Sequence, residues 1–163
     1  MTQPLHGKTA LITGASRGIG KATALALAEK GAQIAVNYLH NEVAAKNTAE
    51  QIRALGVKAE IFQCNVGDLD ALPSLIDSVL KSFGSIDILI HNAALGAFKP
   101  VHKLKINQYD LSMDINARAF LALVQKVLPG MEAKKEGTIL ALSSLGSHRY
   151  IPNYGAIGIS KAA

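Results

Sequence analysis

Two side chains near the end of the sequence have types and a spacing that suit proton transfer. Tyr154 and Lys161 lie seven positions apart in NYGAIGISKAA. A tyrosine hydroxyl stabilises a developing negative charge as a donor or an acid, and a nearby ammonium group lowers its pKa. At ~100° per residue, an offset of seven returns to within about 20° of the same helix face. The pair therefore predicts an active site on one helix, although a packed tyrosine and a surface lysine would also explain it.

A glycine-rich segment, TGASRGIG from Thr13 to Gly20, lies between a predicted strand and a predicted helix. Gly14 suits a tight turn, Gly18 lets the backbone approach a pyrophosphate, and Gly20 allows close packing of helix on strand. The N-terminus of the helix presents free N–H groups and a positive dipole end to phosphate. The segment predicts a dinucleotide site, with a simple tight turn as the alternative. Its expected contacts are Gly14, Ser16, Arg17, Gly18, Ile19 and Gly20.

Strands and helices must alternate to position these residues. The pattern predicts strands at 8–13, 33–37, 58–64, 86–91 and 137–143, and helices at 18–30, 42–55, 69–83, 108–131 and 154–163. Alternation at these lengths indicates a parallel sheet with helices on both faces. Right-handed crossovers favour an α/β, doubly wound Rossmann-type fold with strand order 3-2-1-4-5. No linker or repeat divides the chain, so we expect residues 1–163 to form a single dinucleotide-binding domain.

Composition narrows the class of protein. The chain of 163 residues has a net charge of +5 and a single cysteine, Cys64, so we expect neither an internal disulfide nor a cysteine-based metal site. No apolar run reaches the ~20 residues that span a bilayer, and no secretory signal is recognisable. The basic residues are dispersed, which favours anionic small molecules over nucleic acid and leaves an acidic carrier protein as a weaker option. We therefore expect a cytoplasmic protein without a membrane, nucleic acid or metal partner.

Further motifs follow the glycine segment in a fixed order. The spacing Gly-x-x-x-Gly-x-Gly, followed by Asn65-Val66, His91-Asn92-Ala93-Ala94, Asn116 and Ser143-Ser144, resembles the short-chain dehydrogenase/reductase superfamily over the whole chain. The resemblance implies that Asn65 and Val66 contact adenine and that Asn92 and Ala93 lie beside the cofactor. It also implies that Asn116 and Ser144 belong to the active site. Taken singly, Asn92 could cap a strand, Asn116 could be a buried polar bond and Ser144 could be a turn residue.

The residues after the second predicted strand bear on the choice of cofactor. An acidic residue about 20 positions after the glycines would hold the ribose 2′-hydroxyl of NAD. Here Asn37 to His40 carry no carboxylate, and Arg17 offers a charge-assisted bond to a 2′-phosphate. We expect NADPH, with Arg17 at the 2′-phosphate assisted by His40 and Asn41, Asn37 among the cofactor contacts, and Lys161 at the nicotinamide ribose. The alternative is that Arg17 points into water.

The spacing of the catalytic pair departs from Tyr-x-x-x-Lys, the usual superfamily pattern, because Gly158 is the residue four after Tyr154. Tyr154-(x)6-Lys161 resembles the NADPH-dependent form of the bacterial enoyl-acyl-carrier-protein reductases. Hydride on the β-carbon of a conjugated thioester places charge on an oxygen two atoms away, which is consistent with a displaced tyrosine. The prediction is reduction of enoyl thioesters on acyl carrier protein or CoA in fatty-acid synthesis. A 3-oxoacyl-thioester or other carbonyl reductase and a non-catalytic NADPH-binding fragment are the alternatives.

The position of Lys161 close to Ala163 carries a further expectation. Chains of the resembling family continue with two more strands and a substrate-covering loop, so we expect a C-terminally truncated sequence that lacks those strands. An open edge at the fifth strand then invites association, and a catalytic helix of that length is marginal on its own. The family usually forms tetramers through its long helices, so a homo-oligomer is expected of the longer protein.

Overall fold

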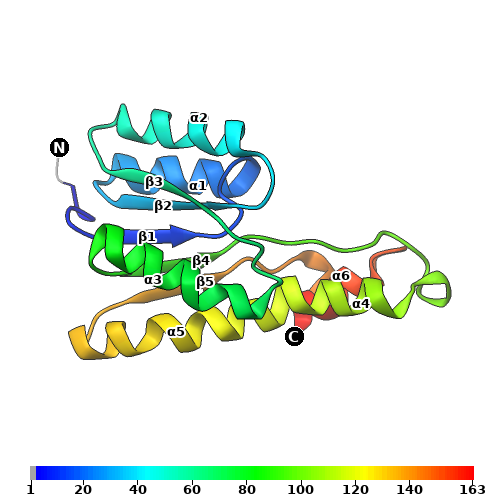
Figure 1. Cartoon of the computed structure of the whole chain (residues 1–163). Coiled ribbons are helices and arrows are strands. Elements are labelled where there is room, and N and C mark those ends of the chain that lie inside the picture. Colours follow the sequence, from blue (N-terminus) through cyan, green and yellow to red (C-terminus); the bar gives the residue numbers. More distant parts are fainter. Residues whose placement is uncertain (1–2) are drawn as a thin grey trace.

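The computed structural model describes residues 3–163. Its five parallel strands form one sheet in the order β3-β2-β1-β4-β5, with helices on both faces (Figure 1). The predicted α/β doubly wound fold and strand order are therefore confirmed. Because the strands are parallel, their carboxyl ends meet at one edge of the sheet, where ligands of such folds bind.

The observed elements lie close to the predicted ranges. The strands are β1 (Thr9–Ile12), β2 (Gln33–Tyr38), β3 (Ala59–Gln63), β4 (Ile88–His91) and β5 (Thr138–Ala141). The helices are α1 (Gly18–Glu29), α2 (Glu42–Arg53), α3 (Leu72–Phe83), α4 (Ile106–Met113), α5 (Ala119–Lys134) and α6 (Gly155–Ala162). Short helical segments are η1 (Leu69–Ala71), η2 (Val101–Lys103), η3 (Asp114–Arg118) and η4 (Leu145–Ser147). None of the helices within residues 3–163 is long and apolar enough to cross a membrane.

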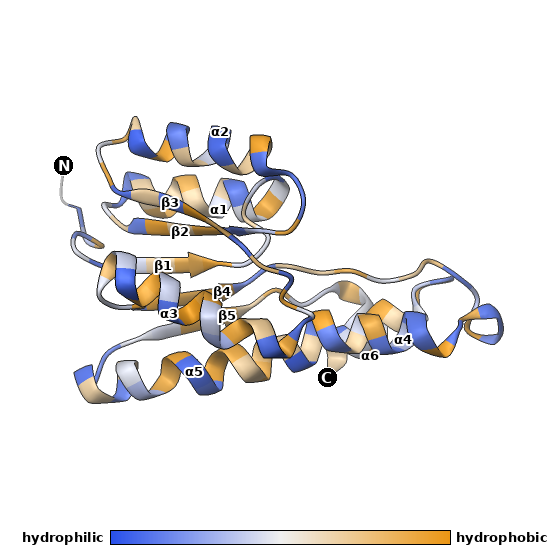
Figure 2. Ribbon diagram, viewed as in Figure 1, coloured by the Kyte–Doolittle hydropathy of each residue, from blue (hydrophilic) through white to orange (hydrophobic). Residues whose placement is uncertain are grey.

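Two hydrophobic cores sandwich the sheet. Helices α1 and α2 pack alanines and Ile52 on one face, while α3 and α5 pack larger side chains, such as Leu75 and Leu123, on the other. Strand β2 lies between both cores, and all but its first residue are buried. Figure 2 shows hydrophobic and hydrophilic residues interleaved along the helices. A strand that is covered on both faces has a continuous run of apolar residues. The central strands are therefore easy to recognise in the sequence.

The helix predicted over residues 108–131 is one rod with an interruption. α4 and α5 are joined by η3, a π-helical turn that contains Asn116, and the rod continues to Lys134 past Pro129. The prediction of a single regular helix is therefore wrong at η3. A π-helical turn shifts the backbone hydrogen bonds out of the α-helical pattern, and such turns occur frequently at functional sites. The helix predicted from Leu69 likewise begins as the short turn η1.

Strand β5 is covered on one face only. Ile139 packs with the core below α3 and α5, whereas Leu140, on the opposite face, is 51% exposed. Among the described residues, α1 and α2 cover β1 to β3 but do not extend over β5 (Figure 1). The sheet is thus completed around the glycine-rich turn and open beside β5.

Candidate active site

The glycine-rich segment forms the turn between β1 and α1. Gly14 and Gly18 have φ of +64° and +58°, in the left-handed region that favours glycine. A Cβ on Gly20 would lie only 2.6 Å from the carbonyl oxygen of Gly14, so the turn packs without side chains. Arg17 precedes α1 and contributes no side-chain cap. The first N–H groups of α1 are therefore presented at the carboxyl edge of the sheet, as an anion site requires.

Asn37 holds this turn from β2. Its Oδ1 accepts a hydrogen bond from the Gly14 N–H at 3.2 Å, and its Nδ2 donates to the carbonyls of Phe62 and Cys64, each at 3.2 Å. The side chain is 2% exposed. Its polar atoms are bonded within the protein and support the turn. The contact of Asn37 with the cofactor stays a prediction.

Asn92 supports the same turn from the end of β4. Its Nδ2 donates to the carbonyls of Thr13 (2.9 Å) and Gly14 (3.0 Å). The N–H groups of Asn92 and Ala93 both donate to Thr13 Oγ1, at 3.0 Å and 2.9 Å. Thr48 Oγ1 on α2 donates to the carbonyl of Ser16 at 3.0 Å. Three elements therefore fix the conformation of the loop.

His91 extends this network to the helix layer. Thr13 Oγ1 accepts two N–H groups, so its hydroxyl proton is directed to His91 Nδ1, 3.1 Å away. His91 Nε2 then carries the ring proton and donates to the carbonyl of Ile115 at 2.9 Å, within the π-helical turn η3. Burial lowers the pKa of His91 to about 4, outweighing the opposite effect of the Ile115 carbonyl. Sequence reasoning missed this role, although a polar His91 at the end of an apolar strand was a usable signal.

The remaining residues expected at the adenosine end lie around the carboxyl ends of β2 and β3. Arg17, His40 and Asn65 are exposed, and Val66 is buried against the core beneath α3 and α5. Asn65 Oδ1 accepts from the Gly67 N–H at 3.1 Å, which shapes the turn after β3. Since β1, β2 and β3 are neighbours in the sheet, these residues surround one edge. The assignment of each to a cofactor contact remains a prediction.

The catalytic residues come together beyond β5. Tyr154 is the residue that precedes α6, and its hydroxyl lies 3.0 Å from Ser144 Oγ at the start of η4. Lys161, near the end of α6, donates from Nζ to the carbonyl of Leu142 at 2.6 Å. Burial lowers the pKa of Lys161. The structure thus brings Ser144 and Tyr154 into contact and anchors Lys161 to the residue after β5, without a direct Lys161–Tyr154 bond among the described residues.

Asn116 links the helix layer to this pair indirectly. Its Nδ2 donates to the carbonyl of Leu95 and to Ser160 Oγ, each at 2.8 Å, and its Oδ1 accepts from the Leu95 N–H at 2.9 Å. All three bonds tie the segment after β4 to α6 across η3. Asn116 is buried, so its side chain positions the active-site segments.

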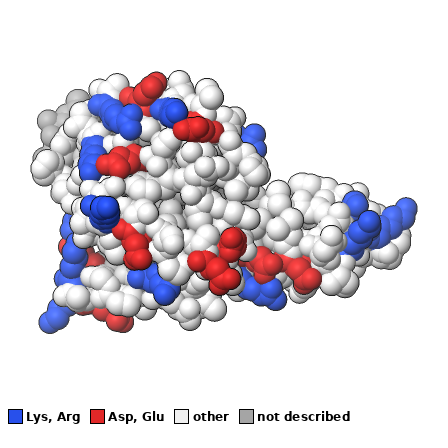
Figure 3. All heavy atoms as spheres, viewed as in Figure 1, with Lys and Arg blue, Asp and Glu red and all other residues white. Residues whose placement is uncertain are grey.

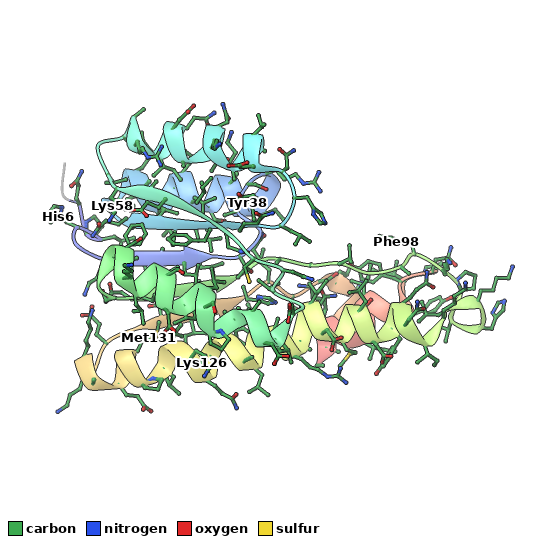
Figure 4. All side chains as sticks on the ribbon, in the orientation of Figure 1. His6, Tyr38, Lys58, Phe98, Lys126 and Met131 are labelled. Atoms are coloured by element: carbon green, nitrogen blue, oxygen red, sulfur yellow. The ribbon has the colours of Figure 1, made fainter. Side chains whose placement is uncertain are left out.

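A pocket of about 520 Å³ lies beside Tyr154. Its walls come from η2, the turn η4 and the exposed side of α6, and they include Val101, His102, Arg149, Tyr150 and Ile159. The Phe98 ring packs 5.5 Å from the Tyr154 ring at the same end of the molecule, where Figure 4 labels it. Several of these apolar side chains are exposed, so the hollow offers apolar contacts next to a reactive hydroxyl.

Comparison with known proteins identifies a family that matches this chain. Residues 8–163 match the family described as short chain dehydrogenase. The chain belongs to that family. A 3-oxoacyl-[acyl-carrier-protein] reductase, FabG, from Staphylococcus aureus is 37% identical over 164 residues, which cover 96% of this chain and 67% of that protein.

Solved structures of the short chain dehydrogenase family agree with the fold. A metagenomic short-chain oxidoreductase in complex with NADP superposes with a TM-score of 0.91 at 33% identity, covering 97% of this chain and 72% of that one. A 7 alpha-hydroxysteroid dehydrogenase complexed with NADH and 7-oxo glycochenodeoxycholic acid gives 0.93 at 33% identity, covering 99% and 62%. This chain therefore spans about two thirds of the length of such relatives.

These comparisons correct one preference drawn from the sequence. This short chain dehydrogenase is an oxidoreductase, as predicted. Its similarity to FabG does not support the prediction of an enoyl reductase over the alternative of a carbonyl reductase. The Tyr154-(x)6-Lys161 spacing remains a feature of the chain that its relatives' names do not explain.

The turn after β1 fits the dinucleotide that the family implies. Gly18 has a positive φ and no atom within 4 Å of the position a Cβ would take, so its backbone faces open space. The uncapped N-terminus of α1 begins there. A pyrophosphate bound at this point would meet backbone N–H groups and the positive end of the helix dipole.

Proposed function

We propose that the protein is an NADPH-dependent reductase of 3-oxoacyl thioesters. The observation that carries the proposal is the 3.0 Å contact between Ser144 Oγ and Tyr154 Oη. Two hydroxyls at this separation converge on one carbonyl oxygen, which is where negative charge develops when a ketone is reduced. The similarity to FabG supports the same substrate class.

Each active-site residue has a task in this reaction. NADPH, when bound, supplies the hydride. Tyr154 donates its proton to the ketone oxygen, and Ser144 hydrogen-bonds the same oxygen or the phenol. Lys161, held at Leu142, brings a positive charge to the end of β5 that favours the phenolate left after proton transfer. The buried bonds of Asn116 keep α6 and the segment after β4 in register.

The preference for NADPH over NADH rests on charge at the carboxyl ends of β1 and β2. No carboxylate follows β2 before Glu42, whereas Arg17 and His40 are exposed there. An adenosine 2′-phosphate would meet a guanidinium group and no fixed negative charge at this site. The NADP-bound structural relative supports this choice.

The acyl chain is proposed to arrive as a thioester of acyl carrier protein or CoA. The pocket beside Tyr154 has apolar residues such as Val101 and Ile159 in its walls, and the exposed Lys103 and Lys105 follow its lining residue His102 in the sequence. Figure 3 shows basic side chains without acidic neighbours at that end of the molecule. We also propose a cytoplasmic homo-oligomer, in keeping with the family resemblance.

Reduction of enoyl thioesters is the second candidate, and the position of Tyr154 favours it. Ile157, which is 7% exposed, occupies the place four residues before Lys161 where the usual spacing would put the tyrosine. Tyr154 lies almost one turn earlier, at the start of α6. In an enoyl thioester the negative charge appears on an oxygen two atoms from the carbon that receives hydride, so a displaced donor suits it.

Acetoacetyl and crotonyl thioesters separate the two candidates when NADPH absorbance is followed with the purified protein. We expect faster turnover of acetoacetyl thioester and a fall of at least tenfold in kcat for Ser144→Ala with that substrate. Turnover of crotonyl thioester alone overturns the first candidate in favour of the second. NADPH binding without turnover of either substrate would favour the non-catalytic alternative.

A further inference from the structure

The ring of Tyr154 lies against a glycine of the turn η4. A Cβ built on Gly146 would lie 2.4 Å from Tyr154 Cδ1 and 2.5 Å from Cε1, distances that real side chains do not adopt. The ring therefore occupies the space that any other residue at position 146 would fill. Gly146 needs no special φ, so the requirement for glycine here is one of space.

The same turn supplies the oxygen that the Tyr154 hydroxyl meets. Ser144 precedes η4, and its Oγ accepts from the Gly146 N–H at 3.3 Å while lying 3.0 Å from Tyr154 Oη. The position of Ser144 Oγ and the position of the ring thus both depend on Gly146. We infer that Gly146 is a positioning residue, which sets the phenol of Tyr154 on Ser144. The inference deepens the proposed function and rests on it.

The ring has little freedom to move elsewhere. The Phe98 ring packs against it with centroids 5.5 Å apart, and the Tyr154 carbonyl accepts from the Gly158 N–H at 2.7 Å, which fixes the backbone at the start of α6. A Cβ at position 146 would have to push the ring roughly 1 Å to reach ordinary van der Waals contact. A misplacement of about 1 Å in an active site costs on the order of 10²-fold in rate.

Gly158 connects this slot with the unusual spacing. A Cβ on Gly158 would lie 2.8 Å from the Gly146 carbonyl oxygen, so η4 and α6 touch through two glycines. Position 158 is the one where a lysine four residues after Tyr154 would stand. The close approach that admits the ring leaves no room for that side chain. Lys161 carries the charge from the next turn of α6 and reaches the Leu142 carbonyl.

The test compares Gly146→Ala with Gly130→Ala, a matched control in α5 whose added Cβ would meet nothing within 4 Å. We expect a fall of about 10²-fold in kcat for Gly146→Ala, with the NADPH dissociation constant unchanged, and no fall for Gly130→Ala. In a Ser144→Ala background, Gly146→Ala should cost less than it does in the unmodified protein, because the part of the loss that comes from the Ser144–Tyr154 contact is already absent. Equal loss in both backgrounds overturns the inference.

A readout without turnover keeps this result separate from the proposed function. The chain has four tyrosines, so the ¹³Cζ resonance of Tyr154 can be assigned by its absence in Tyr154→Phe. We expect it to shift in Gly146→Ala and not in Gly130→Ala; an unmoved resonance overturns the inference even in a protein that reduces neither thioester. If Gly146→Ala fails to bind NADPH, Gly158→Ala should reproduce the shift, and loss of binding in both variants counts against positioning.

Discussion

The cofactor turn and the catalytic end of the molecule are built in opposite ways. Around the turn, the side chains of Thr13, Asn37, His91 and Asn92 are largely withdrawn from solvent, and their polar atoms are hydrogen-bonded within the protein. Around Tyr154, by contrast, large apolar side chains such as Phe98 and Tyr150 are exposed, and the hydroxyl pair depends on a few contacts. The first region is fixed before any ligand arrives, whereas the second relies on the packing of one short helix.

This difference separates what binding and chemistry require. A satisfied, buried polar network is rigid, and every member is costly to remove. The Tyr154 hydroxyl makes a single side-chain hydrogen bond, to Ser144, and its ring is held by packing alone, so small changes there should alter rate before they alter stability. We therefore expect mutations in the buried network to lower stability, and mutations around Tyr154 to lower the reaction rate first.

The largest effect is expected at the catalytic end. Tyr154→Phe removes the proton donor and should lower kcat by about 10²–10⁴-fold while leaving NADPH affinity unchanged. Tyr150→Phe is the matched control, because Tyr150 lines the same pocket and is 88% exposed. Steady-state kinetics and a cofactor titration measure both. Retained turnover in Tyr154→Phe would remove this residue from its role.

The next effect concerns charge at the cofactor turn. Arg17→Glu replaces a guanidinium group by a carboxylate that repels a 2′-phosphate, so NADPH affinity should fall by about 10–100-fold and NADH affinity much less. Lys30→Glu, at the far end of α1, makes the same change of charge away from the site. Fluorescence titrations with each cofactor give the comparison. Equal losses for NADPH and NADH would show that Arg17 does not bind the 2′-phosphate.

The buried network predicts a pH dependence of stability. Below its ordinary pKa of 6.5, His91 takes up a proton in the unfolded chain but not in the folded one, whose pKa is about 4. Stability that is present above pH 6.5 is therefore lost as the pH falls toward 4, by about 2 kcal/mol between pH 7 and pH 5. His91→Asn should remove most of this loss. Urea unfolding at the two pH values tests it, and an unchanged difference in the variant would rule out His91 as the source.

How much could be predicted from the sequence follows the same division. The glycine spacing, the strands and Asn92 are local patterns, and the structure confirms the fold they predicted. The hydrogen bonds by which His91 and Asn37 support the turn could not be predicted, because they join residues far apart in the sequence. The requirement for glycine at position 146 could not be predicted either, because the clash that excludes other residues arises only where η4 packs against α6. Long-range contacts, and not residue types, decide these roles.

The smallest expected effect concerns the hydrogen bonding of buried polar groups in β1. Thr9 in β1 is fully buried, and its Oγ1 is the one buried side-chain polar atom in residues 3–163 without a hydrogen-bond partner. Its N–H is bonded to Asp87 Oδ2 at 2.9 Å and does not depend on the side chain. Thr9→Val keeps the shape and removes an unsatisfied hydroxyl, so it should stabilise the protein by about 1 kcal/mol.

Thr138→Val, on the exposed strand β5, is the control for Thr9→Val and should change stability by less than about 0.5 kcal/mol. Both threonines begin strands of the same sheet, so β-propensity contributes alike to the two substitutions. Thermal unfolding of the two variants separates burial from propensity. A gain in Thr138→Val that equals the gain in Thr9→Val would mean that strand preference, and not the unpaired hydroxyl, limits stability in β1. The contrast between the buried and the open parts of the sheet would then not extend to this position.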